Sequence, residues 1–134
     1  MKQDFMKAVA VLIEEDPDMR ALMRYVLDNA GVEVITLQGD SFLIEQIGRL
    51  NPDVVLIDLQ WPPSERLALI NQLRMSVTNG ALPIIALVMD GAQGEESLMV
   101  GATAIIRKPD DVRHLPEVID QVLEQHYSRW VRSV

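Results

Sequence analysis

The chain has 134 residues, enough for one domain of ordinary size, and 49% of them are hydrophobic. This composition excludes a disordered chain, and the absence of cysteine excludes disulfides, thiolate catalysis and metal sites built on cysteine. With 20 acidic and 12 basic residues the net charge is −8, which disfavours nucleic acid and anionic membranes as direct partners. Neither a signal peptide nor an apolar run of the ~18 residues needed to cross a membrane is present, so we expect a cytoplasmic protein.

Short apolar runs recur along the chain and predict β-strands. They are rich in β-branched residues, and acids, glycines or prolines bound them. In chain order they are Ala8–Ile13, Val32–Leu37, Val54–Ile57, Ile84–Val88 and Ala104–Ile106. Near-continuous apolarity over such a length is typical of strands buried on both faces of a parallel sheet.

The stretches between these runs have the apolar spacing of helices. The predicted helices are Pro17–Ala30, one capped by Asp40 or Ser41 and ending at Leu50, one after the loop Gln60–Ser64, a short one at Glu95–Val100, and a last one opened by Asp110 or Asp111. Five such units predict an α/β fold of the flavodoxin-like type, a doubly wound five-stranded parallel sheet with helices on both faces. We expect a single domain over residues 1–134, with a core of 7–125 and a helical extension to 134.

Charged residues follow the predicted strands, at the end of the sheet where α/β proteins bind ligands. Glu14 and Glu15 follow the first strand, Asp58 follows the third, and Lys108 follows the fifth. Carboxylates suit Mg²⁺, and a lysine supplies positive charge to an oxyanion. Taken singly, each residue also has a structural interpretation, as a helix N-terminal acid or a turn residue. Their order along the chain favours one shared site.

With these residues in register, the sequence resembles the receiver domain of two-component response regulators. The matching segments are Val11–Arg20, Pro52–Asp58 with Pro62 four residues later, Leu82–Leu87, and Gly101-Ala102 ahead of Lys108-Pro109. The resemblance implies a signalling domain, not an enzyme, that acts through protein–protein interaction in a phosphorelay. The partners it implies are a sensor histidine kinase or phosphotransfer protein, and a downstream protein effector. No effector region follows Val134, so we expect an output domain to be absent or removed.

The resemblance also assigns roles to individual residues. Asp58 falls on the phosphoacceptor, and Lys108 falls on the lysine that pairs with the phosphoryl group and precedes a cis peptide bond. Glu14, Glu15, Asp58 and the backbone carbonyl of Gln60 fall on the ligands of Mg²⁺.

Several positions depart from the family pattern. Glu15 stands where an aspartate is usual, and its longer side chain predicts weak Mg²⁺ binding, because this ion demands near-ideal octahedral geometry. The switch positions of the family, a hydroxyl residue and an aromatic one, fall on Val88 and Ile105. A glycine usual in the third helix falls on Arg66. These departures concern both the cation and the way in which phosphorylation is reported.

Three interpretations stay open on the sequence alone. They are a working receiver with altered output, a pseudo-receiver that binds partners without phosphorylation, and a flavodoxin-like flavin protein or small enzyme. The third is least favoured, because Glu14-Glu15-Asp16 is no phosphate-binding loop and Gln60 is no second acid for a hydrolase. Tyr127, Trp130 and Val131 extend the last apolar stripe, which fits either core packing or the surface of a homodimer.

Overall fold

The computed structural model describes residues 8–59, 62–76 and 81–133, with side chains described up to residue 126. In chain order the elements are β1 Val9–Ile13, α1 Pro17–Asn29, β2 Glu33–Thr36, α2 Leu43–Leu50, β3 Val54–Asp58, α3 Ser64–Met75, β4 Ile84–Val88, α4 Gly91–Met99, β5 Ala104–Arg107, the 3₁₀ turn Val112–His114 and α5 Leu115–Ser133. Each predicted apolar run forms a strand, and each strand is followed by a helix.

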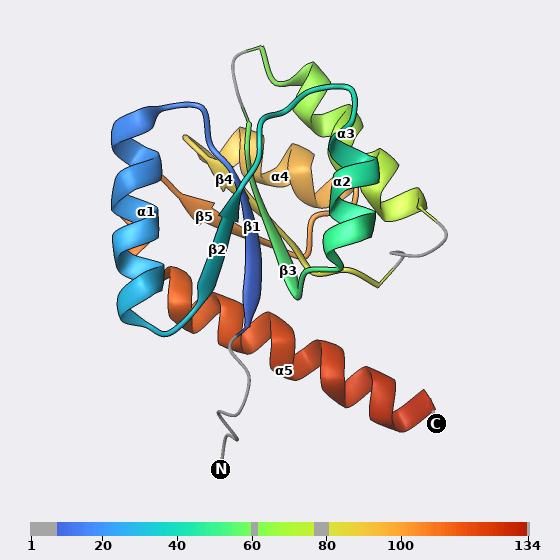
Figure 1. Cartoon of the computed structure of the whole chain (residues 1–134). Coiled ribbons are helices and arrows are strands. Elements are labelled where there is room, and N and C mark those ends of the chain that lie inside the picture. The colour runs from blue at the N-terminus through green and yellow to red at the C-terminus, as the bar shows by residue number, and fades with distance from the viewer. Residues whose placement is uncertain (1–7, 60–61, 77–80, 134) are drawn as a thin grey trace.

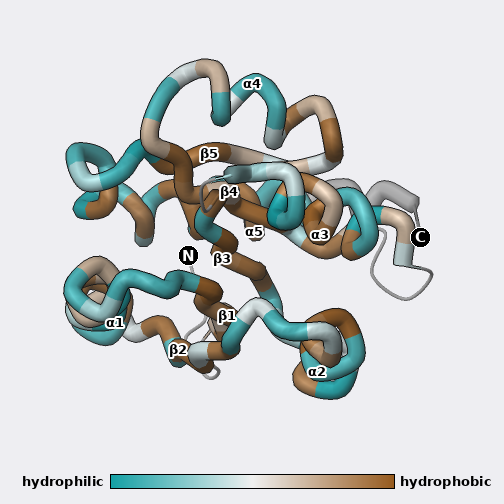
Figure 2. The backbone as a smooth tube through the Cα atoms, turned by 90° about the horizontal axis from the view of Figure 1, so that it is seen from above, coloured by the Kyte–Doolittle hydropathy of each residue, from teal (hydrophilic) through white to brown (hydrophobic). Residues whose placement is uncertain are grey.

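The strands form one parallel sheet in the order β2-β1-β3-β4-β5 (Figure 1). Helices α1 and α5 cover one face, and α2 and α3, with α4 beside β5, cover the other (Figure 2). The predicted fold class is therefore confirmed. The strand order reverses between β1 and β3, and in such sheets ligands bind beyond the carboxyl ends of the strands at this point.

The core consists of two apolar layers, one on each side of the sheet. In β3, Val54 and Leu56 face α1 and α5, whereas Val55 and Ile57 face α2 and α3. All four of these side chains have no exposed surface. Because both faces of the strand are buried, its sequence is continuously apolar, and this continuity ends at the charged residue Asp58.

Three helices begin at positions other than those predicted. Helix α4 begins at Gly91, four residues before the predicted Glu95, because the side chain of Asp90 accepts a hydrogen bond from the Gln93 N–H at 2.9 Å and caps it. Helix α2 begins at Leu43, so neither Asp40 nor Ser41 is its N-cap. The Asp40 carboxylate instead accepts a hydrogen bond from the Phe42 N–H at 2.9 Å.

Helix α5 also begins later than predicted, at Leu115. The 3₁₀ turn stands where Asp110 or Asp111 was expected to open the helix, and Pro116 lies in the first turn of α5. The helix continues to Ser133 and projects past the body of the domain (Figure 1). Over the part of the chain that the structure describes, no helix is both long and apolar enough to cross a membrane.

Candidate functional site

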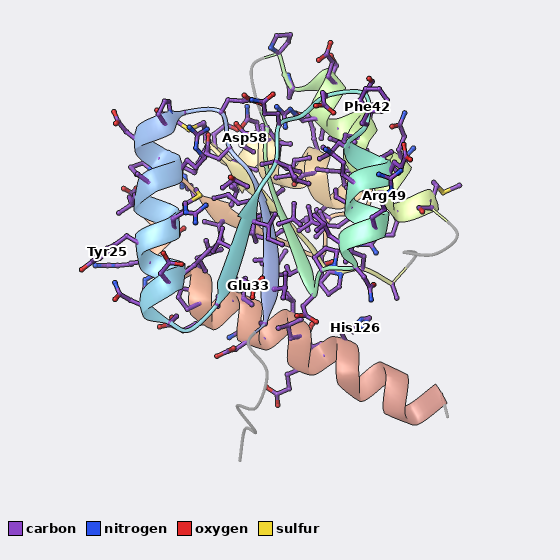
Figure 3. All side chains as sticks on the ribbon, in the orientation of Figure 1. Tyr25, Glu33, Phe42, Arg49, Asp58 and His126 are labelled. Carbon is purple, nitrogen blue, oxygen red and sulfur yellow. The ribbon has the colours of Figure 1, made fainter. Side chains whose placement is uncertain are left out.

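Asp58 is the last residue of β3 and lies at the carboxyl end of the sheet. It pairs in register with Leu87 of β4 and is 3% exposed. Figure 3 shows it between the N-terminal parts of α1 and α3, at the opposite end of the molecule from His126. A buried carboxylate at this point must be balanced by neighbouring groups, because burying an unpaired charge is costly.

Buried Glu14 and half-buried Lys108 form an ion pair beside Asp58. The Lys108 Nζ donates to Glu14 Oε1 at 2.9 Å, and the Asp16 backbone N–H donates to Glu14 Oε2 at 3.2 Å. Both carboxylate oxygens of Glu14 therefore have a partner. The Lys108-Pro109 peptide bond is cis, and the Lys108 backbone N–H donates to the Val88 carbonyl at 2.8 Å.

Arg66, on the first turn of α3, brings a second cation to the site. Its Nη2 donates to Glu15 Oε1 at 2.7 Å, and its Nη1 lies 3.6 Å from Asp58 Oδ1. The residue is 5% exposed. Its guanidinium lies against the backbone of Gly39, where a Cβ atom would come within 2.6 to 2.8 Å of three guanidinium atoms. The absence of a side chain at Gly39 therefore makes room for this cation.

The environment of Asp58 alters its acidity. Burial raises its pKa to about 6, and the negative charge of Glu14 acts in the same direction. The positive charges of Arg66 and Lys108 act against this rise. Asp58 therefore titrates far closer to neutral pH than an exposed aspartate, and in its ionised form it is a carboxylate with a high demand for a positive partner.

The resemblance placed Mg²⁺ between Glu14, Glu15, Asp58 and Gln60. The structure brings the three carboxylates to one end of the sheet, whereas Gln60 lies outside the described residues. Glu14 is bound to Lys108, and Glu15 and Asp58 face Arg66. Among the described side chains, no group of three His, Asp or Glu residues is arranged to hold a metal ion. In this arrangement the residues do not fit a divalent cation, because two protein cations already occupy the carboxylates.

The two predicted switch positions lie on the other half of the sheet. Val88 ends β4 and is 1% exposed, and Ile105 of β5 is 37% exposed. Both approach Gly94 of α4: a Cβ atom there would lie 2.8 Å from Ile105 Cδ1 and 3.9 Å from Val88 Cγ2. Two aliphatic side chains thus seat α4 on the sheet, and neither can donate a hydrogen bond.

Sequence reasoning missed the role of Arg66 in the site. It noted this residue only as a departure from a usual glycine. Arg66, Ile70 and Leu73 are the buried residues of α3, and their spacing puts them on one stripe of the helix. A charged residue on an otherwise buried stripe needs a buried partner, so the spacing itself contained the signal.

Comparisons with known proteins agree with this fold. Residues 10–120 match the family model described as the response regulator receiver domain. The phosphate regulon transcriptional regulatory protein PhoB of Rhizobium meliloti is 34% identical over 73% of this chain and 44% of its own length. NtrX of Brucella abortus superimposes with a TM-score of 0.82 at 22% identity, over 96% of this chain and 29% of that one. The chemotaxis protein CheY4 of Vibrio cholerae superimposes with a TM-score of 0.76 at 22% identity, over 87% of this chain and 99% of that one.

The chain spans only part of the curated relatives it matches. It covers 26% of the DNA-binding transcriptional regulator NtrC of Klebsiella pneumoniae and 32% of a protein-glutamate methylesterase/protein-glutamine glutaminase of Rhizobium etli. The likeness to these proteins is therefore a likeness to one of their parts.

Proposed function

Since the chain belongs to the response regulator receiver domain family, which serves two-component signalling, we propose that it receives a phosphoryl group on Asp58. The observation that carries this proposal is the buried Asp58 carboxylate at the carboxyl end of β3, with the cations of Lys108 and Arg66 at the same site. Receiver domains interact with histidine kinases and output domains. We propose a phosphohistidine on such a kinase or on a phosphotransfer protein as the donor.

The proposed transfer uses groups that the structure places together. An ionised oxygen of Asp58 forms a bond to phosphorus while the phosphorus–nitrogen bond of the phosphohistidine breaks. The electron pair of that bond stays on the imidazole nitrogen of the donor, and the product is an acyl phosphate on Asp58. Lys108 and Arg66 stabilise the negative charge on the transferring group, because positive charge fixed in a water-poor site is strongly effective. The chain itself then acts by binding a protein partner, without an enzymatic output of its own and in the cytoplasm.

A second candidate is a pseudo-receiver that binds its partner without phosphorylation. The apolar contact of Val88 and Ile105 with Gly94 favours it, because this contact has no group that could bond a phosphoryl oxygen. The partner would then bind a surface that is the same in every state of Asp58.

Intact-mass measurement separates the two candidates. After incubation with acetyl phosphate, the wild type should gain the mass of one phosphoryl group, and Asp58→Asn should gain none. Asp28→Asn removes the same charge from the exposed side of α1 and should be modified like the wild type. An unmodified wild type would favour the pseudo-receiver, and a modified Asp58→Asn variant would refute the assignment of Asp58.

A further inference from the structure

We propose that Arg66 is a built-in counterion that takes the place of a divalent cation at this site. Receiver domains generally bind Mg²⁺ next to the phosphoacceptor, and this inference concerns the same site as the proposed function. It does not require that Asp58 be phosphorylated, because it is a statement about the unmodified domain.

The contacts of Arg66 support this role. One nitrogen of the guanidinium is bonded to Glu15, and the other faces Asp58. Arg66 Nη1 and Asp58 Oδ1 are both buried and have no hydrogen-bond partner, and they lie 3.6 Å from each other. A buried carboxylate oxygen without a donor needs a cation nearby. The guanidinium lies between two carboxylates that would otherwise be free to coordinate a metal ion.

The surroundings of Arg66 hold the guanidinium in this place. Gly39, in the loop after β2, leaves the space that the guanidinium fills, and a Cβ atom there would overlap with it. With 5% of its surface exposed, Arg66 is packed against its neighbours as long as position 39 has no side chain. The cation is thus part of the packed structure.

The charge of the site points in the same direction. Glu14, Glu15 and Asp58 carry three negative charges when ionised, and Arg66 and Lys108 carry two positive ones. One net negative charge remains, whereas the three carboxylates beside Lys108 alone would carry two, so Arg66 lowers the attraction of the site for a divalent cation. A divalent ion would also lie close to the guanidinium, and the repulsion at about 4 Å weakens its binding more than about tenfold even at the dielectric constant of water.

Divalent-cation binding, measured without any phosphodonor, tests the inference. The probes are Mg²⁺ and Mn²⁺. Binding of Mg²⁺ is measured by the shift of the midpoint of thermal unfolding, and binding of Mn²⁺ by paramagnetic broadening of amide signals near Asp58. The wild type should show neither effect at millimolar concentrations. Arg66→Ala should bind Mg²⁺ more than about tenfold more tightly than the wild type does. The midpoint of its thermal unfolding should rise with added Mg²⁺, because a ligand that binds the folded state stabilises it.

A second variant reaches the same site without a change of charge. Gly39→Ala should push the guanidinium away from Glu15 and Asp58, so it should also gain Mg²⁺ binding. Two controls are matched to these variants. Arg49→Ala removes an exposed positive charge from the outer side of α2 (Figure 3), and Gly48→Ala adds a methyl group that meets no atom within 4 Å. Neither control should gain binding.

The outcomes decide the inference in each case. The inference would be overturned if the wild-type protein bound Mg²⁺ as tightly as Arg66→Ala does. It would also be overturned if Gly39→Ala folded but bound Mg²⁺ no more tightly than the wild type. If Arg66→Ala fails to fold, the wild type and Gly39→Ala decide it alone. A failure here leaves the mass test of Asp58 unaffected, and a failure of that test leaves this one unaffected.

Discussion

The two halves of the sheet's carboxyl end hold their side chains in place by different forces. At the ends of β1 and β3, Asp58, Glu14 and Arg66 are buried charged groups that are held by ion pairs. At the ends of β4 and β5, Val88 and Ile105 contact α4 through aliphatic atoms around Gly94.

This difference has a consequence for signalling. Ionic contacts change strongly when the charge of one member changes, whereas aliphatic contacts are almost insensitive to it. A ligand shifts a conformational equilibrium only through interactions that differ between the two states. We therefore expect that a charge change at Asp58 rearranges the ionic half and leaves the apolar half nearly unchanged.

The largest expected effect is the pH dependence that Asp58 gives to stability. A pKa of about 6 in place of the usual value near 4 corresponds to a free-energy difference of about 3 kcal/mol between the protonated and ionised forms of Asp58 in the folded state, relative to the unfolded chain. Because the folded state holds this proton more tightly than the unfolded chain, the contribution of Asp58 is fully present below pH ~4 and is lost as pH rises through ~6. Asp58→Asn should remove this loss and raise the free energy of unfolding at pH 7 by up to about 3 kcal/mol.

Denaturant titrations at pH 4, 5, 6 and 7 would measure this effect. Asp28→Asn, on the exposed side of α1, is the matched control and should follow the wild type. If wild type and Asp58→Asn differ equally at every pH, the ionic half does not carry the pH dependence assigned to it.

Val88→Thr places a hydroxyl group at the junction of the two halves. Val88 is 1% exposed, so a hydroxyl without a partner there should lower the free energy of unfolding by about 1–2 kcal/mol. A phosphoryl group on Asp58 would offer the missing acceptor and should reduce this loss. Unfolding titrations of both proteins, with and without phosphorylation, would show it. Equal losses in both states would mean that the hydroxyl does not reach the phosphoryl group.

Gly94→Ala tests the apolar half alone. Alanine is better than glycine inside a helix by about 1 kcal/mol, and Gly48→Ala, with open space around its Cβ, should show that gain. At Gly94 the new methyl group meets Ile105, so the gain should be smaller or absent. Shortening the neighbour, in Gly94→Ala with Ile105→Ala, should make the methyl group favourable again. Equal gains for Gly94→Ala and Gly48→Ala would show that Ile105 does not hold α4.

Much of the fold could be predicted from the sequence because its strands are buried on both faces. Runs such as Val54–Ile57 are continuously apolar, and a polar or charged residue such as Asp58 marks the end of the apolar stretch. Helix starts were less predictable, since they depend on single capping contacts. The Asp90 side chain caps α4 at a glycine, where apolar spacing gives no signal.

The candidate site could be predicted only in part, and the reason is physical. Topology brings Glu14, Asp58 and Lys108 together, since parallel strands end at the same edge of the sheet. The contact of Arg66 with Asp58 depends on the direction of a side chain from α3 and on the space left at Gly39. Gly39 and Arg66 are 27 positions apart, and Gly39 has no side chain, so the pair gives no periodic pattern in the sequence.

The central claim is that the ionic half responds to phosphorylation and the apolar half does not. Backbone amide chemical shifts, recorded before and after phosphorylation in a sample whose intact mass shows the added group, test it most directly. We predict large changes next to Asp58, Glu14, Arg66 and Lys108, and small changes throughout residues 89–106. Large changes spread across residues 89–106 would contradict the claim, because they would show that α4 and β5 report the state of Asp58.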